Sequence, residues 1–233
     1  MTLAFITGGS RGLGYATAEG LKATGIELVL FAKNESRLSQ SASRLDAKHE
    51  IVDLENIAQT REVFGKAMEK YGTPQILILA HGVMSDRMAK TLRTNDQEWR
   101  RVMTINLDSV FTIVNEVGSK MAEARDGRVI IYSACLGRMS GPGSAGGLAP
   151  YRISKAGVNS LVRNLAHETG HGSRGFWVDA ICPNHSRTDM GGPDAPRSAE
   201  EGAETALWLA TRELVAGQTQ TGVLWEDREI VPW

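Results

Sequence analysis

The stretch Thr7-Gly8-Gly9-Ser10-Arg11-Gly12-Leu13-Gly14 follows a short apolar run, Leu3 to Ile6, and leads into residues of helical composition, Tyr15 to Leu21. A glycine-rich turn between a strand and a helix favours phosphate binding, because the backbone can approach the anion and the N–H groups of the helix N-terminus point at it. Such turns are common, so the motif alone is weak evidence. It gains weight from Tyr151 and Lys155, four residues apart at the start of another predicted helix. Together they predict a nucleotide at one end of a sheet, with a proton donor beside it.

Composition argues against several classes of function. The chain has 233 residues, and 42% of them are hydrophobic, which is enough for a sizeable core. Its 26 basic and 27 acidic residues give a formal net charge of -1, with no overall attraction to nucleic acid or anionic membranes. No apolar run approaches the length of a membrane span, and the first six residues lack the features of a signal peptide. We therefore expect a cytoplasmic protein that binds neither nucleic acid nor membrane.

The two cysteines, Cys135 and Cys182, form no motif. Both have apolar neighbours in the sequence, which predicts buried free thiols and fits a reducing cytosol. We expect no metal site in this chain.

Predicted strands and helices alternate along almost the whole chain. The strands are expected at Leu3–Thr7, Glu27–Ala32, Glu50–Asp53, Ile76–Leu79, Val129–Ser133, Trp177–Ile181 and Gly222–Trp225. The helices are expected at Gly12–Ala23, Glu35–Leu45, Asn56–Tyr71, Asn95–Ala124, Tyr151–Glu168 and Ser198–Thr211. Short strands without polar alternation are buried on both faces, and the helices between them imply right-handed crossovers. The pattern predicts an α/β fold, a Rossmann-type doubly wound and mostly parallel sheet, as a single domain over residues 1–233 with its ligands at the carboxyl ends of the strands.

A further set of motifs follows in a fixed order. It comprises Thr7-Gly8-x-x-x-Gly12-x-Gly14, Asp53, Gly82, Asn106, Tyr151-x-x-x-Lys155 and Pro183 through Thr188. In this order and on this pattern, the chain resembles the short-chain dehydrogenase/reductase family in its single-domain form, over nearly its whole length. The segment Arg187 to Pro193, the residues that follow it, and the ending Ile230-Val231-Pro232-Trp233 are similar to the carbonyl-reductase-like branch.

The resemblance implies a nicotinamide cofactor, and charge indicates which one. An acid after the second strand would bind a ribose 2′-hydroxyl and favour NAD, but the strand ends at Lys33. Lys33 and Arg11 are positioned to neutralise the 2′-phosphate of NADP(H), although two solvated surface cations are the alternative. Asp53 resembles the family's adenine-contacting acid, or is a turn residue. The cofactor contacts expected from the resemblance are Gly8, Ser10, Arg11, Gly12, Leu13, Gly14, Lys33, Asp53, Leu54, Gly82, Tyr151, Lys155, Pro183 and Thr188.

The resemblance makes Tyr151 the general acid and Asn106 the holder of a proton-relay water. A phenol has a pKa near 10, and an ammonium group one helical turn away, here on Lys155, is expected to lower it. The alternatives are an ordinary helix face for the pair and a helix-kinking polar residue for Asn106.

Two positions around the expected active site depart from the family pattern. The fourth strand is followed by His81-Gly82 where the family has an asparagine-rich segment, so His81 is either a packed side chain or a replacement donor. Aligning the fifth strand puts Ala134 at the family's active-site serine, with Ser133 one residue early. Adjacent strand residues face opposite sides, so Ser133 can polarise a carbonyl only if the strand end shifts register. Ser140 and Ser144 are alternatives for that hydroxyl.

A third departure lies in Pro183-Asn184-His185-Ser186, where the family has Pro-Gly. Asn184 is expected to tolerate the left-handed conformation. His185 and Ser186 then either enter the pocket, which we favour, or face the surface. The segment Arg187–Pro196 is the expected substrate lid.

The first functional hypothesis is an NADP(H)-dependent carbonyl reductase or alcohol dehydrogenase acting on a small ketone, aldehyde or alcohol. Tyr151, Lys155 and Asn106 would carry it, with Ser133 as carbonyl polariser. The alternatives are a non-redox enzyme on the same scaffold, such as an isomerase, dehydratase or cyclase, and a non-catalytic NADP(H)-binding protein. By resemblance alone, the chain is expected to form a homodimer or homotetramer through its two long helices.

Overall fold

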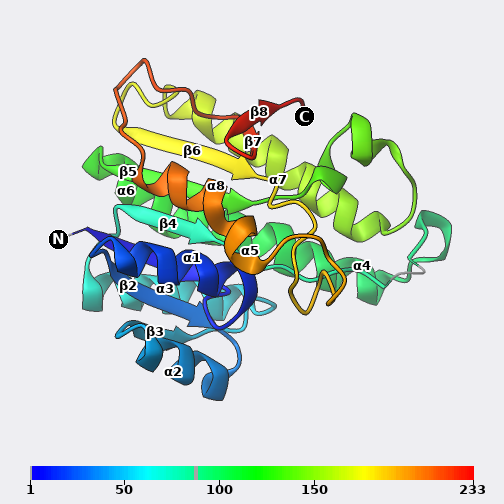
Figure 1. Ribbon diagram of the computed structural model, residues 1–233, viewed down its shortest axis with the longest axis horizontal. Helices are drawn as coiled ribbons and strands as arrows, with labels where there is room; N and C mark the ends of the chain where they lie inside the picture. Colours follow the sequence, from blue (N-terminus) through cyan, green and yellow to red (C-terminus); the bar gives the residue numbers. More distant parts are fainter. Residues whose placement is uncertain (1, 87–88) are drawn as a thin grey trace.

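The computed structural model describes residues 2–86 and 89–233, and within them eight strands form one sheet (Figure 1). The strand order is β3-β2-β1-β4-β5-β6-β7-β8; all neighbours are parallel except β7 and β8. The strands are β1 Leu3–Thr7, β2 Glu27–Ala32, β3 Lys48–Ile51, β4 Ile76–Leu79, β5 Gly127–Tyr132, β6 Phe176–Ile181, β7 Leu224–Glu226 and β8 Glu229–Val231. The predicted doubly wound, mostly parallel sheet is confirmed.

Helices cover both faces of the sheet. The α-helices are α1 Gly12–Ala23, α2 Glu35–Arg44, α3 Ile57–Tyr71, α4 Asp96–Met103, α5 Ser109–Ile113, α6 Ser119–Ala124, α7 Ala149–Glu168 and α8 Ala199–Thr211. Short 3-10 turns are η1 Thr91–Arg93, η4 Cys135–Gly137 and η5 Gly141–Ser144, and π-helical segments are η2 Thr104–Asp108 and η3 Val114–Gly118.

The core consists of two layers, one on each side of the sheet. In β1, Phe5 packs into the layer shared with α3, α5 and α7, whereas Ala4 and Ile6 pack into the layer shared with α1, α2 and α8. All three side chains are fully buried, as expected for a central strand of a parallel sheet covered on both faces. The order reverses between β1 and β4, and the strands point toward the side where the loops after β4, β5 and β6 gather (Figure 1).

Capping residues fix where several helices begin. Asn95 accepts a hydrogen bond from the Glu98 amide, and Ser198 forms the predicted capping box with Glu201. The helix expected up to Ala124 is continuous in direction, but it switches between α and π hydrogen bonding at η2 and η3. The first of these π segments contains Asn106, so the expected irregularity at that residue is present.

Two strand predictions were wrong at the edges of the sheet. β3 begins at Lys48, two residues before the predicted start, because an edge strand carries polar, exposed residues that hide its pattern. β8 was missed altogether. It pairs with β7 across a turn in which Asp227 (φ 53°) and Arg228 (φ 65°) are both left-handed. Such hairpin turns usually contain glycine or asparagine, and this one has neither at its centre.

Candidate active site

The glycine turn between β1 and α1 has the geometry of an anion cradle. Gly8 (φ 67°) and Gly12 (φ 55°) are left-handed, and a Cβ added to Gly14 would lie 2.4 Å from the carbonyl oxygen of Gly8. The first turn of α1 has no side-chain cap and no acidic residue. No acidic side chain of this turn therefore competes for its N–H groups, which suits a bound phosphate. Ser10 and Leu13 lie within the same turn, whose backbone is tied to α2 by a hydrogen bond from Ser41 to the Ser10 carbonyl.

The cations of the predicted 2′-phosphate site are arranged differently from the expectation. Arg11 forms an ion pair with Asp189, and Arg37 lies 3.9 Å from the same carboxylate. Lys33 instead pairs with Asp53 at 2.7 Å, and this hydrogen bond raises the pKa of Lys33. Arg37 was missed by the sequence analysis, although a basic residue in the helix turn just after the second strand was an available signal. Lys33 and Asp53 follow adjacent strands, with Leu54 buried next to Asp53.

Tyr151 and Lys155 lie together on the first turns of α7, and both are almost completely buried, with 6% and 4% of their surface exposed. The Lys155 Nζ donates to the carbonyl oxygen of Tyr132 at 2.7 Å and lies 5.9 Å from the centre of the Tyr151 ring. Burial lowers the pKa of Lys155 to about 8. The pair sits at the carboxyl end of β5, beside the reversal in strand order.

The expectation that Lys155 lowers the pKa of Tyr151 is not met in this structure. Burial raises the pKa of the Tyr151 phenol, and the neighbouring Cys182 and Cys135 raise it further. Burial destabilises the charged phenolate, and the Lys155 Nζ donates to the Tyr132 carbonyl. The phenol therefore stays protonated at neutral pH, which is the form a proton donor needs.

Asn106 joins the helix to the segment that leaves β4. Its Nδ2 donates to the Val83 carbonyl at 2.9 Å and to the Ser154 hydroxyl at 3.1 Å, and its Oδ1 accepts from the Val83 amide at 2.8 Å. A Cβ added to Gly82 would lie 3.4 Å from this Oδ1 and 3.5 Å from the Lys155 Nζ. The structure thus brings Asn106, Gly82 and Lys155 together around one small space.

His81 is a packed side chain within a directed chain of hydrogen bonds. The Ser109 hydroxyl donates to the Ile105 carbonyl at 2.7 Å, so it accepts from the Nε2–H of His81 at 2.9 Å. A neutral imidazole has one N–H, so Nδ1 accepts from the Thr7 hydroxyl at 2.6 Å. Burial lowers the pKa of His81 to about 3, which keeps the ring neutral. His81 thereby links the end of β1 to α5.

Ser133 is not placed as a carbonyl polariser. Its amide donates to the Ile181 carbonyl, so the ladder continues through this residue without a shift in register. Its hydroxyl donates to Asn159 Oδ1 at 2.5 Å, inside the contact with α7. The alternative hydroxyls are also elsewhere: Ser140 donates to the Trp233 carbonyl, and Ser144 is exposed. Ala134 remains at the serine position, and the expected role of Ser133 was wrong because the strand keeps its alternation.

The loop between β6 and α8, residues 182–198, rests against the glycine turn. Asn184 adopts the expected left-handed conformation (φ 57°) after Pro183. A Cβ added to Gly12 would lie 3.2 Å from Cγ2 of Thr188, so this threonine sits at the cradle. His185 is turned within the loop, with its Nε2 2.8 Å from the Gly191 carbonyl, and Ser186 donates to the Pro183 carbonyl. Both side chains are thus hydrogen-bonded within the loop, and His185 is exposed, which differs from the favoured placement of the two residues in the pocket.

The two cysteines meet beside Tyr151. The Cys135 amide donates to Cys182 Sγ at 3.0 Å, and both residues are free thiols. Cys182 is buried, as expected, whereas Cys135 is only partly buried. They follow β5 and β6, which are adjacent parallel strands, so this neighbourhood was the signal that the sequence analysis overlooked.

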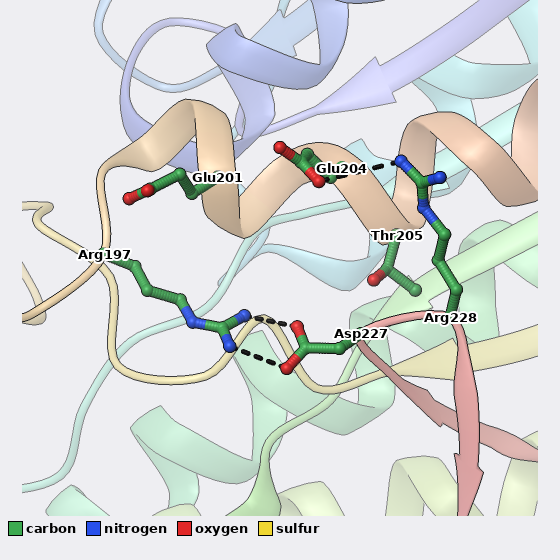
Figure 2. A pocket seen from close by; sticks show the side chains of 6 residues that line it. All are labelled: Arg197, Glu201, Glu204, Thr205, Asp227 and Arg228. Carbon is green, nitrogen blue, oxygen red and sulfur yellow. Dashed lines mark hydrogen bonds and ion pairs between the residues drawn. The ribbon is translucent and has the colours of Figure 1, made fainter.

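A separate hollow of about 310 Å³ lies between α8 and the β7–β8 turn, and Figure 2 shows its charged lining. Arg197 pairs with Asp227, and Arg228 pairs with Glu204. Because these charges satisfy one another and no predicted site residue lines the hollow, we assign it no chemistry. In the described part of the chain, no group of three or more possible metal ligands is found, and no helix has the length and apolar character to cross a membrane.

Comparison with known proteins gives consistent matches over most of the chain. A sequence profile of the family described as short chain dehydrogenase matches residues 2–199. The chain is 32% identical over 190 residues to the 3-oxoacyl-[acyl-carrier-protein] reductase FabG of Escherichia coli (strain K12), which covers 81% of this chain and 75% of the relative. Identity to the 3-oxoacyl-[acyl-carrier-protein] reductase of Synechocystis sp. is 31% over 194 residues, with coverage of 81% and 75%.

Solved structures share the fold. A protein from Brucella melitensis 16M, described as ribose-5-phosphate isomerase, superposes with a TM-score of 0.84 at 26% identity, covering 96% of this chain and 89% of that one. A blue fluorescent protein from a metagenomic library, solved in complex with NADPH, gives a TM-score of 0.83 at 23% identity and covers 96% and 94%. At this identity, the second similarity shows the fold alone.

Proposed function

Because the chain belongs to the short-chain dehydrogenase/reductase family, we propose that it is an NADP(H)-dependent oxidoreductase that interconverts a ketone or aldehyde and an alcohol. The observation that carries the proposal is the position of Tyr151. Its buried phenol lies beside Lys155 at the carboxyl end of β5, on the same edge of the sheet as the glycine turn. The curated relatives named above are reductases of an acyl ketone, which supports a carbonyl substrate.

The residues present fit a nicotinamide dinucleotide. The uncapped first turn of α1 and the left-handed Gly12 suit the pyrophosphate, with Thr188 next to them. Gly82 leaves the backbone after β4 open toward Asn106 and Lys155, where a larger side chain would crowd both. We expect the remaining contacts from the sequence analysis, including Pro183 and Leu54, along the same path. When bound, the cofactor supplies or accepts the hydride.

The phosphate form of the cofactor is favoured by charge. Arg11 and Arg37 converge on one carboxylate, Asp189, at the end of the glycine turn. Two guanidinium groups that can share one carboxylate can also share a 2′-phosphate, since both anions accept forked hydrogen bonds. Lys33 forms an ion pair with Asp53. It would contact the adenosine end of the cofactor only if this ion pair broke.

The chain's own contribution to the reaction is the proton. Tyr151 donates its phenolic proton to the carbonyl oxygen during reduction and accepts it back during oxidation. The Lys155 ammonium stabilises the phenolate that forms, because the two groups share a water-poor environment. Asn106 holds the backbone at Val83 and donates to Ser154 of α7, so it fixes the segment after β4 against that helix.

A second candidate is a non-redox enzyme on the same scaffold, such as an isomerase. The observation in its favour is Ala134, which leaves the usual hydroxyl absent while Ser133 is bonded to Asn159. A structural neighbour at 26% identity is described as an isomerase. Such an enzyme would keep Tyr151 as proton donor and leave the cofactor unconsumed.

One experiment separates the two candidates. Purified protein is mixed with NADPH and a panel of ketones and aldehydes, and absorbance of the reduced cofactor is followed together with product identity. The redox proposal expects cofactor consumption in step with alcohol, and a loss of about 10²–10⁴-fold in turnover for Tyr151→Phe with NADPH binding retained. Product without cofactor consumption would support the second candidate. Tight NADPH binding without any product would leave neither supported and would point to a binding protein.

We also propose that the protein works in the cytoplasm as a homodimer or homotetramer. Two free cysteines fit a reducing compartment. Phe111 on α5 and Ile153 on α7 are large apolar side chains with 52% and 43% of their surface exposed, on the two helical stretches predicted to pair.

A further inference from the structure

The chain has two cysteines, 47 residues apart, and the fold places them in contact. Cys135 begins the 3-10 turn η4 after β5, and Cys182 follows β6. The Cys135 amide donates to Cys182 Sγ at 3.0 Å, so the backbone of one cysteine contacts the thiol of the other. This contact is present whatever reaction the protein catalyses.

The two thiols differ in exposure and acidity. Cys182 is 2% exposed, whereas Cys135 is partly accessible to solvent. Interaction with the Cys182 side chain lowers the pKa of Cys135, with Arg138 lowering it and burial and Glu226 raising it, while the pKa of Cys182 is raised by Cys135 and by burial. An accessible, acidic thiol next to a second, protected thiol is the arrangement of a reacting and a resolving cysteine.

We propose that Cys135 and Cys182 are a modification site for peroxides, at which Cys135 reacts and Cys182 resolves the product to an intramolecular disulfide. The Cys135 thiolate attacks one oxygen of hydrogen peroxide, the O–O bond breaks, and sulfenic acid and water result once one proton is taken up. The Cys182 sulfur then attacks the Cys135 sulfur, and the hydroxyl leaves as water with the Cys182 proton. Two thiols are oxidised, one peroxide is reduced, and two waters form.

Disulfide formation requires the two sulfurs to approach to about 2 Å, the length of a disulfide bond. Cys182 is anchored by its amide, which donates to Trp225 in β7, so the adjustment falls on Cys135 and the start of the 133–151 loop. That segment carries Ala134, and the two thiols already raise the pKa of the Tyr151 phenol. Oxidation therefore reshapes the wall of the proposed active site; this consequence rests on the proposed function, but the disulfide itself does not.

The test is made on the full chain with hydrogen peroxide as the oxidant. Intact-mass measurement under denaturing conditions is expected to show the loss of two hydrogens from a single chain, and thiol titration is expected to fall from two to zero. Dithiothreitol should restore both values. Retention of both thiols, or a disulfide that only joins two chains, would overturn the proposal, and neither outcome bears on the Tyr151 chemistry.

Two variants assign the roles. In Cys182→Ala, Cys135 is expected to stop at sulfenic acid, which a cyclic 1,3-diketone traps, and its labelling by iodoacetamide should require a higher pH than in the wild type, because Cys182 lowers its pKa. In Cys135→Ala, the buried Cys182 should keep its thiol over the same time. Oxidation of Cys182 in that variant as fast as Cys135 in the other would contradict the assignment. The wild-type mass measurement decides the disulfide even if one variant fails to fold.

Discussion

At the scale of single residues, the decisive position is Ala134, which stands where a hydroxyl is expected. A hydrogen-bond donor at the developing oxyanion is worth about 10²–10³ in rate at comparable sites. If the protein is a reductase that works without this donor, Ala134→Ser should raise kcat for ketone reduction about tenfold or more. Stopped-flow or steady-state assays with NADPH measure this change in kcat.

The matched control is Ala145→Ser, which adds the same hydroxyl to an exposed part of the same loop. It should leave kcat unchanged. A fall in kcat for Ala134→Ser, with the fold intact by circular dichroism, would argue that this site has been adapted to a chemistry other than carbonyl reduction.

Asp189 is a second decisive residue, because its carboxylate lies against Arg11 and Arg37, the two cations of the proposed 2′-phosphate site. All three side chains are more than half exposed, so each ion pair is worth about 0–1 kcal/mol. Asp189→Asn should therefore tighten NADPH binding by roughly two- to fivefold and change NADH binding much less. Fluorescence titration of both cofactors measures the two dissociation constants.

Asp194→Asn removes the same charge from an exposed position of the same loop and serves as the control. If both variants bind NADPH more tightly to the same extent, the effect comes from the overall charge of the protein and not from the position of Asp189. If Asp189→Asn strengthens the binding of NADPH and NADH equally, Asp189 does not compete with the 2′-phosphate.

At the scale of elements, the buried bonds of His81 connect β1, the end of β4 and α5. Its pKa in the folded protein, about 3, lies below the usual value of 6.5, so the unfolded chain binds more protons between these values. The neutral, buried His81 therefore stabilises the folded protein fully above pH 6.5. As the pH falls below 6.5, this contribution to the free energy of unfolding decreases by about 1.4 kcal/mol per pH unit. Urea unfolding between pH 6.5 and 5 should show this slope.

His81→Asn should reduce the slope, whatever it does to stability at neutral pH. His167→Asn, at an exposed position of α7, is the comparison. An unchanged slope in His81→Asn would show that the ring is protonated in the folded state.

Elements in the interior were predictable, and elements at the rim were less so. Ile76–Leu79 was predicted to the residue, since a strand covered on both faces is apolar throughout. The two edge strands lie at opposite ends of the sheet, Lys48–Ile51 and Glu229–Val231. Their exposed side chains interrupt the continuous apolar pattern by which a buried strand is predicted. Helix starts at Asn95 and Ser198 were predictable because capping is local chemistry.

The candidate site shows the same limit. Tyr151, Lys155 and Asn106 could be selected from spacing and resemblance, but the hydrogen-bond partner of Ser133 depends on where α7 packs. The pairing of Asp189 with Arg11 and the contact of the cysteines also join segments distant in sequence. Such contacts follow from the strand order rather than from local pattern.

At the scale of the whole molecule, Phe111 and Ile153 leave apolar surface on α5 and α7. Contact with a second copy would remove that surface from water, which stabilises an assembly. We expect wild-type protein to have at least twice the mass of one chain by light scattering, and Phe111→Glu to shift it toward a single chain.

Leu92→Glu is the comparison, because Leu92 is 98% exposed and lies on η1, outside the two helices predicted to pair. It should leave the mass unchanged. A wild-type protein with the mass of one chain would remove the basis for the proposed assembly.

The strand order also has a consequence for synthesis. β1 to β4 are complete by Leu79, but the partner for the free side of β4 begins only at Gly127. At about 5–20 residues per second, a ribosome needs roughly 2–10 s to supply β5. Throughout that interval the nascent chain presents the unpaired backbone of Ile76–Leu79, a short apolar template for a neighbouring chain. Slow elongation between residues 80 and 127 is therefore expected to lower the yield of folded protein, and an early-acting chaperone to restore it.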